Sequence, residues 1–238
     1  IDPTHTTAYR YRAIAYDDSD KPLPAIADYT KAIELDPQNA TSYYNRATIY
    51  KDSDKQLLAI ADYTKAIELN PKNQNAYFWR GFVYKELDNP ALTIADYTKV
   101  IELDPKDKNT YFLRGLVYEE MDNLALAIAD YTKGIEIDPT DKASYFRRGR
   151  VYQETGKLEL AILDYTTTIK LDPAHVAAYR YRSFAYDDSD ESLLAIADFT
   201  KTIQLDPKDS FAYYRRGWVY DEMDNPTLAI ADYTKAIE

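Results

Sequence analysis

Apolar residues follow helical spacing along the whole chain, and no segment shows the alternation typical of a strand. Counted from the proline of each Asp-Pro or Asn-Pro pair, offsets +6, +10 and +13 hold apolar or small residues. This spacing predicts a first helix from about +4 to +15. A second helix is predicted from Ala-Ile-Ala-Asp-Tyr-Thr-Lys-Ala-Ile-Glu-Leu, found at 25–35 and 59–69. The next proline ends it, because proline disfavours helical geometry in the residue before it.

This two-helix pattern repeats every 34 residues along the chain. The prolines lie at positions 3, 37, 71, 105, 139, 173 and 207, so no insertion separates any two copies. The 238 residues equal seven such periods. We therefore predict a single array of seven repeats, with approximate boundaries at 6–39, 40–73, 74–107, 108–141, 142–175, 176–209 and 210–238.

Polar residues mark the expected helix ends. An asparagine or aspartate that suits an N-cap precedes five of the first helices, at Asn39, Asn73, Asp107, Asp141 and Asp209. Pro90 and Pro226 are well placed for the first turn of a second helix. His5 and His175 lie five periods apart in the same helix-entry slot, so we assign them a structural role.

Composition argues against several classes of function. The chain has no cysteine and two histidines, which excludes thiolate chemistry and leaves little for imidazole catalysis or zinc. Its net charge of −11 argues against nonspecific nucleic-acid binding, which depends on neutralising phosphates. No phosphate-binding glycine loop or membrane-length apolar run is present. We therefore expect no enzyme activity, no metal, no cofactor, and neither a nucleic-acid nor a membrane partner.

The location of the protein is less constrained. No signal peptide is visible, which favours the cytoplasm. The chain begins at Ile1 rather than Met, so a longer parent protein stays open.

The pattern resembles the tetratricopeptide repeat family over the whole chain. In the second repeat the family positions are Tyr43, Ala47, Tyr50, Ala59, Tyr63, Ala66 and Pro71. The resemblance implies an all-α fold, a right-handed superhelical α-solenoid of antiparallel helix pairs, and places the first helix of each pair on the concave side. Tyrosine replaces the usual early tryptophan, and Arg12 and its six equivalents replace the usual leucine. These departures resemble an Arg-Gly subtype of the family.

Two charged positions occur in every repeat. Arginine occupies offset +9 and aspartate offset +25 in all seven, on facing helices. We predict an ion pair within each repeat, largely covered by the next repeat. A structural role is favoured over a catalytic one, because seven identical pairs are unnecessary for a reaction.

Twelve aromatic residues lie outside the repeat framework, all on first helices at offsets +4, +7, +8 and +11. They are Tyr11, Tyr44, Phe78, Trp79, Phe82, Phe112, Phe146, Tyr181, Phe184, Phe211, Tyr214 and Trp218. These offsets share one helical face, distinct from the face with +6, +10 and +13. The outer slots of the second helix hold Asp, Thr, Lys and Glu, which predicts a polar outer surface.

The aromatic face has two interpretations. It either lines a groove that binds a peptide segment, or packs between neighbouring first helices and completes the core. For the groove, the candidate residues are Tyr44, Phe78, Phe82, Phe112, Phe146, Arg147, Arg150, Arg180, Phe184, Tyr214 and Trp218. Acidic residues crowd the ends of the first helices, either as solvated helix ends or as a rim for a basic ligand segment. No Lys–Asn clamp is present, so we do not predict the carboxylate-tail binding of some family members.

Two functions therefore stay open. One is a non-catalytic scaffold that binds a protein or peptide partner in the aromatic groove. The other is a structural, self-assembling array without a dedicated ligand, natural or designed. Repeat arrays normally close with polar capping elements, and none is evident, which suggests end-to-end stacking of the last helix on the first.

Overall fold

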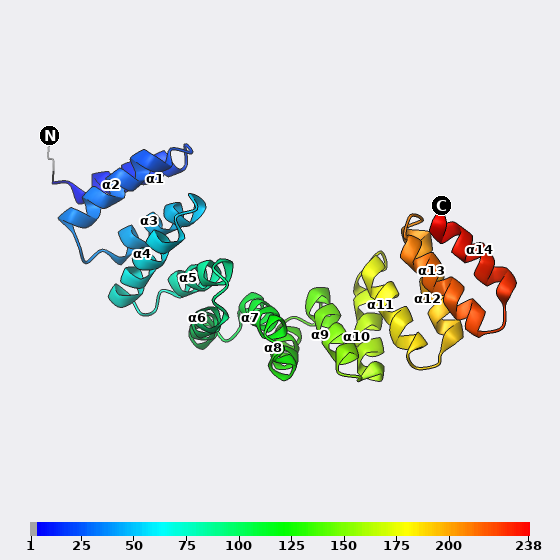
Figure 1. Ribbon diagram of the computed structural model, residues 1–238. Helices are drawn as coiled ribbons and strands as arrows, with labels where there is room; N and C mark the ends of the chain where they lie inside the picture. The colour runs from blue at the N-terminus through cyan, green and yellow to red at the C-terminus, as the bar shows by residue number, and fades with distance from the viewer. Residues whose placement is uncertain (1–3) are drawn as a thin grey trace. The chain divides into compact units, whose positions relative to one another are not determined.

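The computed structural model describes residues 4–238, which form fourteen α-helices and no strand (Figure 1). The first helices of the repeats are α1 (Thr6–Asp17), α3 (Ala40–Asp52), α5 (Gln74–Glu86), α7 (Lys108–Glu120), α9 (Lys142–Glu154), α11 (Val176–Asp187) and α13 (Ser210–Glu222). The second helices are α2 (Pro22–Leu35), α4 (Gln56–Leu69), α6 (Pro90–Leu103), α8 (Leu124–Ile137), α10 (Leu158–Leu171), α12 (Ser192–Leu205) and α14 (Pro226–Ile237). The first helices agree with the predicted offsets to within about one residue. The second helices end where predicted, but α2 and α4 begin three residues before the predicted segments 25–35 and 59–69.

The chain forms two compact units, which meet in sequence inside α7. The N-unit comprises the described residues up to Thr110, and the C-unit comprises residues 111–238. Within the N-unit, α1, α3 and α5 each pack on the second helix of their own repeat, and α2 and α4 pack on the following first helix. The same order holds from α8 to α14 in the C-unit. The predicted all-α architecture of antiparallel helix pairs, an α-solenoid, is confirmed.

The N-terminal ends of the first helices are capped as predicted. Oδ1 of Asn39 accepts a hydrogen bond from the backbone N–H of Ser42 at 3.1 Å. Nδ1 of His5 and of His175 accepts the equivalent bond at 3.1 Å, which confirms a structural role for both histidines. Pro90 begins α6, where its missing N–H breaks no helical bond.

The turn from first to second helix requires a left-handed backbone residue at offset +17. Gly156 has φ 71° there, and aspartate occupies the slot in the other six repeats with φ between 53° and 59°. Aspartate tolerates this region better than most residues because its short side chain bonds locally. The same tight turn therefore joins the helices in every repeat.

The core of each repeat is a buried ring facing a small residue. The aromatic at offset +26 is 0–1% exposed from Tyr29 to Phe199. It lies against the small residue at +10 of the preceding helix: a Cβ added to Gly115 would stand 2.8 Å from Cε1 of Tyr131. A larger residue would therefore push the two helices apart.

The predicted Arg–Asp ion pair is confirmed in every repeat. In the fifth, Nε and Nη2 of Arg148 each donate to one carboxylate oxygen of Asp164 at 2.8 Å. The guanidinium also lies 5.7 Å from the ring centroids of Tyr145 and Tyr152, one turn before and after it on α9. One arginine thus joins two helices and fills the space between two rings.

The predicted cover of this ion pair was wrong, because the preceding repeat supplies it. Nη1 of Arg148 donates to Oγ1 of Thr132 on α8 at 3.0 Å, and Arg46 makes the same bond to Thr30. Arg12 has no preceding helix among the described residues, and its side chain is 58% exposed. The six equivalents are only 14–16% exposed. The threonine at offset +27 is therefore part of the contact between repeats.

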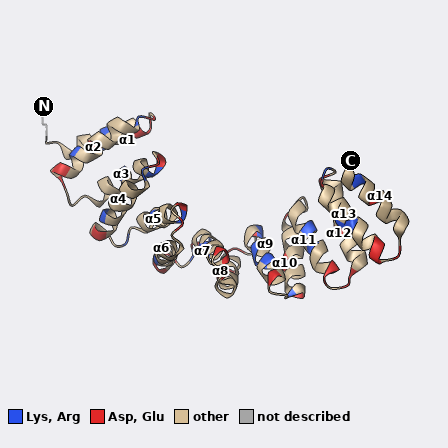
Figure 2. Cartoon of the chain, viewed as in Figure 1, with Lys and Arg blue, Asp and Glu red and all other residues tan. Residues whose placement is uncertain are grey.

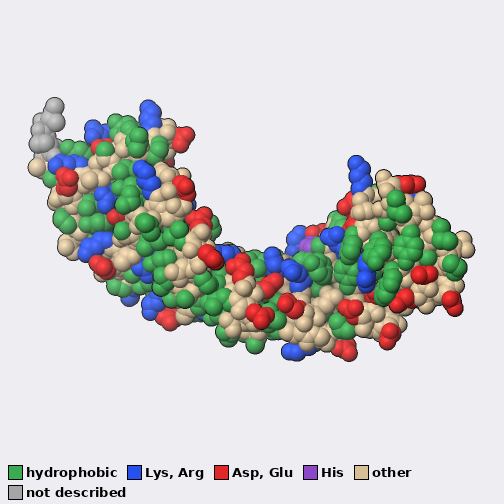
Figure 3. Space-filling model, viewed as in Figure 1, with side chains coloured by type: hydrophobic (Ala, Val, Ile, Leu, Met, Phe, Trp, Pro, Cys, Tyr) green, Lys and Arg blue, Asp and Glu red, His purple; other side chains and the backbone are tan. Residues whose placement is uncertain are grey.

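The predicted polar outer surface of the second helices was also wrong. In six of the seven repeats their first turns expose a leucine at offset +21, each 42–50% exposed: Leu58, Leu92, Leu126, Leu160, Leu194 and Leu228. Each leucine directly precedes the buried residue at +22, so it points about 100° away from the packed face. Hydrophobic side chains accordingly reach the surface of both units (Figure 3). No helix in the described part of the chain is long and apolar enough to cross a membrane.

Candidate binding face on the first helices

The aromatic residues at offset +7 lie with one side against the core. Tyr44 contacts Tyr63 at 5.8 Å between ring centroids, Phe112 contacts Tyr131 at 5.8 Å, and Phe146 contacts Tyr165 at 5.9 Å. All of these +7 rings are half-buried. Packing with the core therefore accounts for one side of each ring.

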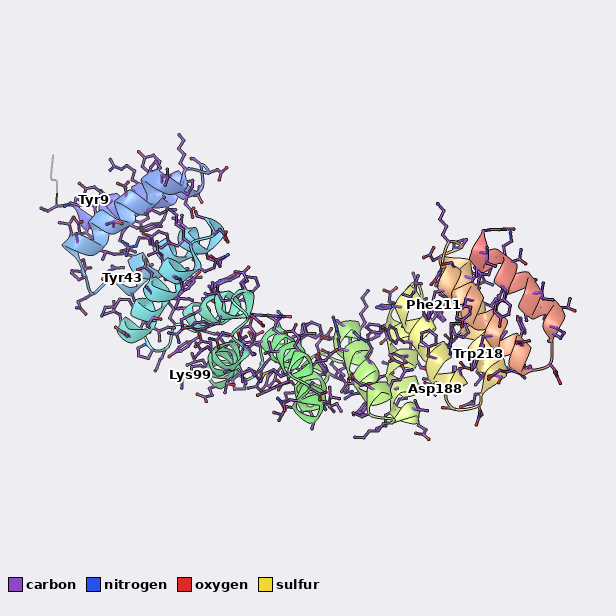
Figure 4. The ribbon with its side chains drawn as sticks, in the orientation of Figure 1. Tyr9, Tyr43, Lys99, Asp188, Phe211 and Trp218 are labelled. Atoms are coloured by element: carbon purple, nitrogen blue, oxygen red, sulfur yellow. The ribbon has the colours of Figure 1, made fainter. Side chains whose placement is uncertain are left out.

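In the C-unit the rings form a continuous row along three successive first helices. Phe146 of α9 contacts Tyr181 of α11 at 5.6 Å, and Tyr181 contacts Phe184 at 6.2 Å. Phe184 contacts Phe211 of α13 at 5.8 Å, and Phe211 contacts Tyr214 at 6.3 Å. We call these five residues the ring row. Figure 4 labels Phe211 and Trp218, which lie two turns apart on α13.

Two arginines stack on the ring row. The guanidinium carbon of Arg150 lies 5.3 Å from the Tyr181 centroid. That of Arg215 lies 5.2 Å from Phe184 and 4.7 Å from Trp218. Tyr181 and Arg215 were not in the candidate set, although offset +8, which they share, signals their position. Of the candidate residues, Phe184 and Trp218 both contact Arg215, and Arg150 contacts Tyr181.

Acidic residues of the same face meet the candidate arginines. Oε1 of Glu119 lies 3.4 Å from Arg147 and 3.8 Å from Arg150, while its Oε2 accepts the hydroxyl of Tyr131 at 2.7 Å. Arg180 donates to Asp209 at 3.2 Å. Other acids gather at the helix ends and turns (Figure 2). The candidate arginines are thus held in place by carboxylates of neighbouring repeats.

Asp187 belongs to the same network. It accepts a hydrogen bond from Nη2 of Arg215 at 2.7 Å. Burial raises the pKa of the Asp187 carboxyl above its ordinary value, although Arg215 opposes this shift. Asp187 therefore holds Arg215 on its rings and is not a freely solvated helix end.

The N-unit has a second aromatic cluster, on α5. Phe78 meets Trp79 edge to face at 5.2 Å, and Trp79 meets Phe82 at 5.7 Å. Nζ of Lys51 on α3 lies 4.5 Å from the Trp79 centroid. Trp79 was also absent from the candidate set, and it links the candidates Phe78 and Phe82.

One buried hydroxyl in this unit has no partner among the described residues. The hydroxyl of Tyr63 lies 3.2 Å from Oγ1 of Thr48. In the C-unit, the equivalent hydroxyl of Tyr165 donates to Oε1 of Gln153 at 2.9 Å. The equivalent hydroxyl of Tyr97 is buried without a hydrogen bond. Burial, reinforced by the charge of Asp96, raises the pKa of Tyr97 to about 12. Tyr97 therefore stays neutral at physiological pH.

A hollow of about 550 Å³ lies away from these rings. It is lined by Pro207, Lys208, Ser210, Tyr213, Lys235 and Glu238 at the last repeat. Lys235 pairs with Glu238. The hollow contains none of the candidate groove residues.

Comparison with models of known protein families identifies the family of this chain. Models described as TPR repeat or tetratricopeptide repeat match residues 24–54, 55–88, 74–107, 109–141, 130–162 and 199–231. The chain is a tetratricopeptide repeat protein. Its family membership supports a role as a protein-interaction scaffold without catalytic activity. The comparison with curated proteins found no match.

Solved tetratricopeptide repeat structures share the fold. The C-terminal part of a repeat protein from Cytophaga hutchinsonii has a TM-score of 0.83 at 20% identity, covering 96% of this chain and 94% of that chain. A repeat protein from Parabacteroides merdae has a TM-score of 0.68 at 20% identity, covering 97% and 91%. YrrB, described as a TPR protein with an unusual peptide-binding site, has a TM-score of 0.70 at 23% identity, covering 79% and 97%. At these identities the likeness concerns the fold.

Proposed function

We propose that this tetratricopeptide repeat protein binds a peptide segment of a partner protein along the aromatic face of its first helices. The ring row of the C-unit carries the proposal. Its rings contact one another from α9 to α13, and each stays partly exposed although its other side packs on the repeat. A continuous, half-exposed apolar row is unusual for a surface without a partner. YrrB, a relative in fold, is described as peptide-binding.

The surroundings of the row suit a peptide better than a small molecule. Arg150, Arg215 and their carboxylate partners provide hydrogen-bonding groups beside the rings. Within the C-unit, Phe112, Arg147, Arg180 and Trp218 add to the proposed binding face. In the N-unit, Tyr44, Phe78 and Phe82 form a proposed aromatic face of their own. An elongated face of this kind fits an extended or helical segment.

A random-peptide display selection tests the proposal. We expect the wild-type chain to enrich a peptide motif, and the triple variant Phe82→Ala/Phe112→Ala/Phe146→Ala to lose it, because three partly exposed rings are removed. A second variant, Leu163→Ala, removes an exposed apolar side chain of α10 (60% exposed) outside the aromatic face and should keep the motif.

Circular dichroism separates lost binding from lost folding in the triple variant. The proposal fails if folded wild-type protein enriches no motif. It also fails if the folded triple variant enriches the same motif as strongly as the wild type.

A second function, end-to-end self-association, has its own observation. Thr132, Thr166 and Thr200 each accept a hydrogen bond from the arginine of the following repeat. Among the described residues, the hydroxyl of Thr234 on α14 bonds only to the Ile230 carbonyl of its own helix, and Arg12 of α1 is exposed. The two ends of the described chain thus carry the two halves of one contact. We propose that α1 of a second copy packs on α14 in the manner of an internal repeat.

Analytical ultracentrifugation tests this contact. We expect the mean mass to rise with protein concentration, and Ile237→Glu to abolish the rise, because Ile237 is 86% exposed on α14. Leu57→Glu, at a position 76% exposed on α4, is the matched control and should leave the rise intact. A wild-type chain that stays monomeric over the whole concentration range would contradict the contact.

A further inference from the structure

A hollow of about 250 Å³ opens on the first helices of the N-unit. Gln74 and Asn75, in the first turn of α5, form one side, and Asn109, at the start of α7, forms another. Pockets for drug-sized ligands usually measure about 300–1,000 Å³. The smaller volume suits one residue of a longer ligand.

The apolar walls of the hollow are already fixed in position. Phe78 and Trp79 line it. Phe78 stacks on the buried Tyr97 at 5.8 Å and 28°, and Trp79 is supported by Phe82 and by Lys51. Val100, fully buried, also lines the hollow. Because these wall residues are already held in position, they lose little conformational freedom when an apolar side chain binds in the hollow.

Three side-chain amides border these walls. The carboxamides of Gln74, Asn75 and Asn109 make no hydrogen bond to another residue in the described part of the chain. Asn75 and Asn109 occupy the same offset, +4, in successive repeats. Each carboxamide has an NH₂ donor and a carbonyl acceptor, which matches the acceptor and donor of a peptide bond.

The single carboxylate of the hollow is already engaged. Oδ1 of Asp107 accepts the backbone N–H groups of Asn109 at 3.1 Å and Thr110 at 3.3 Å, and Oδ2 accepts the Thr110 hydroxyl at 2.7 Å. It thereby caps α7, whose helix dipole partly neutralises its charge. No lysine or arginine lines the hollow. A charged ligand residue would lose hydration without gaining an ion pair.

We infer that this hollow binds one neutral apolar residue of an extended peptide, with its side chain against Phe78 and Trp79 and its backbone amides on Asn75 and Asn109. The inference rests on the proposed peptide-binding function and specifies one position of that ligand. It predicts that charged residues are excluded at this position.

Titration of three capped tripeptides into the ¹⁵N-labelled full chain tests the inference by NMR. The probes are acetyl-Gly-Leu-Gly-amide and the same peptide with Glu or Lys in the centre. We expect saturable shifts of the Trp79 indole signal and of the Asn75 and Asn109 side-chain amides with the Leu probe. The Glu and Lys probes should bind at least fivefold more weakly.

The matched variant is Asn75→Asp/Asn109→Asp. It keeps side-chain size but replaces each donor by a carboxylate, and both positions lie in first turns, where negative charge is favourable. The Leu probe should bind this variant about tenfold more weakly, which corresponds to roughly 1.4 kcal/mol. The inference is overturned if the Leu probe gives no saturable shifts, if all three probes bind alike, or if the variant binds like the wild type.

The outcome of this experiment can be distinguished from the outcome of the display selection. A library motif that binds the wild type and the Asn75→Asp/Asn109→Asp variant equally would support the peptide face and reject the hollow. No library motif, together with selective binding of the Leu probe, would reject the ring row as a peptide site and leave the hollow as an isolated side-chain site.

Discussion

Replacing Arg148 by methionine is expected to lower the free energy of unfolding by about 3–5 kcal/mol. The substitution leaves Asp164, whose side chain is only 3% exposed, without its bidentate partner. Methionine and the preceding repeat still keep water from the carboxylate. Urea denaturation followed by circular dichroism measures the loss, and hydrogen exchange of α9 and α10 amides localises it.

The loss should depend on pH in a defined direction. Burial raises the pKa of Asp164, while the hydrogen bond and charge of Arg148 lower it, so removing Arg148 raises this pKa further. The folded variant then binds the Asp164 proton more tightly than the unfolded chain does. The part of the penalty that comes from the unpaired Asp164 charge is complete above the folded-state pKa and disappears below the unfolded-state value of about 3.9. The deficit should therefore shrink as pH falls from 7 towards 4.

Arg12→Met is the matched control within the same chain. The Arg12 side chain is 58% exposed, so water reaches the Asp28 carboxylate once the guanidinium is removed. This variant should lose clearly less stability than Arg148→Met. Equal losses for the two variants, or no pH dependence of the Arg148→Met deficit, would contradict the account of a covered ion pair.

Tyr165→Ala is expected to destabilise the protein by about 3–5 kcal/mol through a cavity in the core of the fifth repeat. The Tyr165 side chain is fully buried and contacts Phe146 at 5.9 Å and Tyr181 at 6.1 Å. Both of these residues belong to the ring row. Removing their support should also weaken binding of any peptide selected on the wild-type chain. Denaturation midpoints and peptide titration measure the two effects.

Two further substitutions test how much the buried aromatic ring of Tyr165 contributes to stability. Tyr165→Phe should cost only about 1 kcal/mol, because it removes the hydroxyl that lies 2.9 Å from Gln153 but keeps the ring. Phe199 naturally fills the equivalent slot at 0% exposure. Tyr233→Ala, at the half-exposed slot of the last repeat, should cost less than Tyr165→Ala. If Tyr165→Phe were as damaging as Tyr165→Ala, the hydroxyl rather than packing would dominate.

Local features of the repeat were predictable from the residues alone. The caps at Asn39 and His175 depend on a side chain and a backbone N–H three residues apart, a distance set by helix geometry. Pro90 at the start of α6 follows from the fixed φ of proline. The period of 34 residues implied that the same local structure would recur in every repeat. The repeat boundaries and the groove residues stay predictions.

Other features depend on which elements meet in space. Arg148 and Asp164 were predicted to pair, but only the packed helices show that Thr132 of the preceding repeat completes the contact. The leucines at offset +21 resemble core residues in composition, yet no neighbouring helix covers them. Helical periodicity defines the faces of a helix but does not say which face a neighbour occupies.

The amino-acid sequence alone was enough to predict the helix pairs, their caps, their period and the set of aromatic residues on the first helices. The tertiary structure decided how those rings are used: Phe146 lies against Tyr165 on one side and joins the ring row on the other. It also placed Asn75 and Asn109 beside Phe78 around one hollow. The physical reason is that local propensities act over a few residues, whereas exposure and side-chain contacts depend on helices 16 to 34 residues apart in the chain.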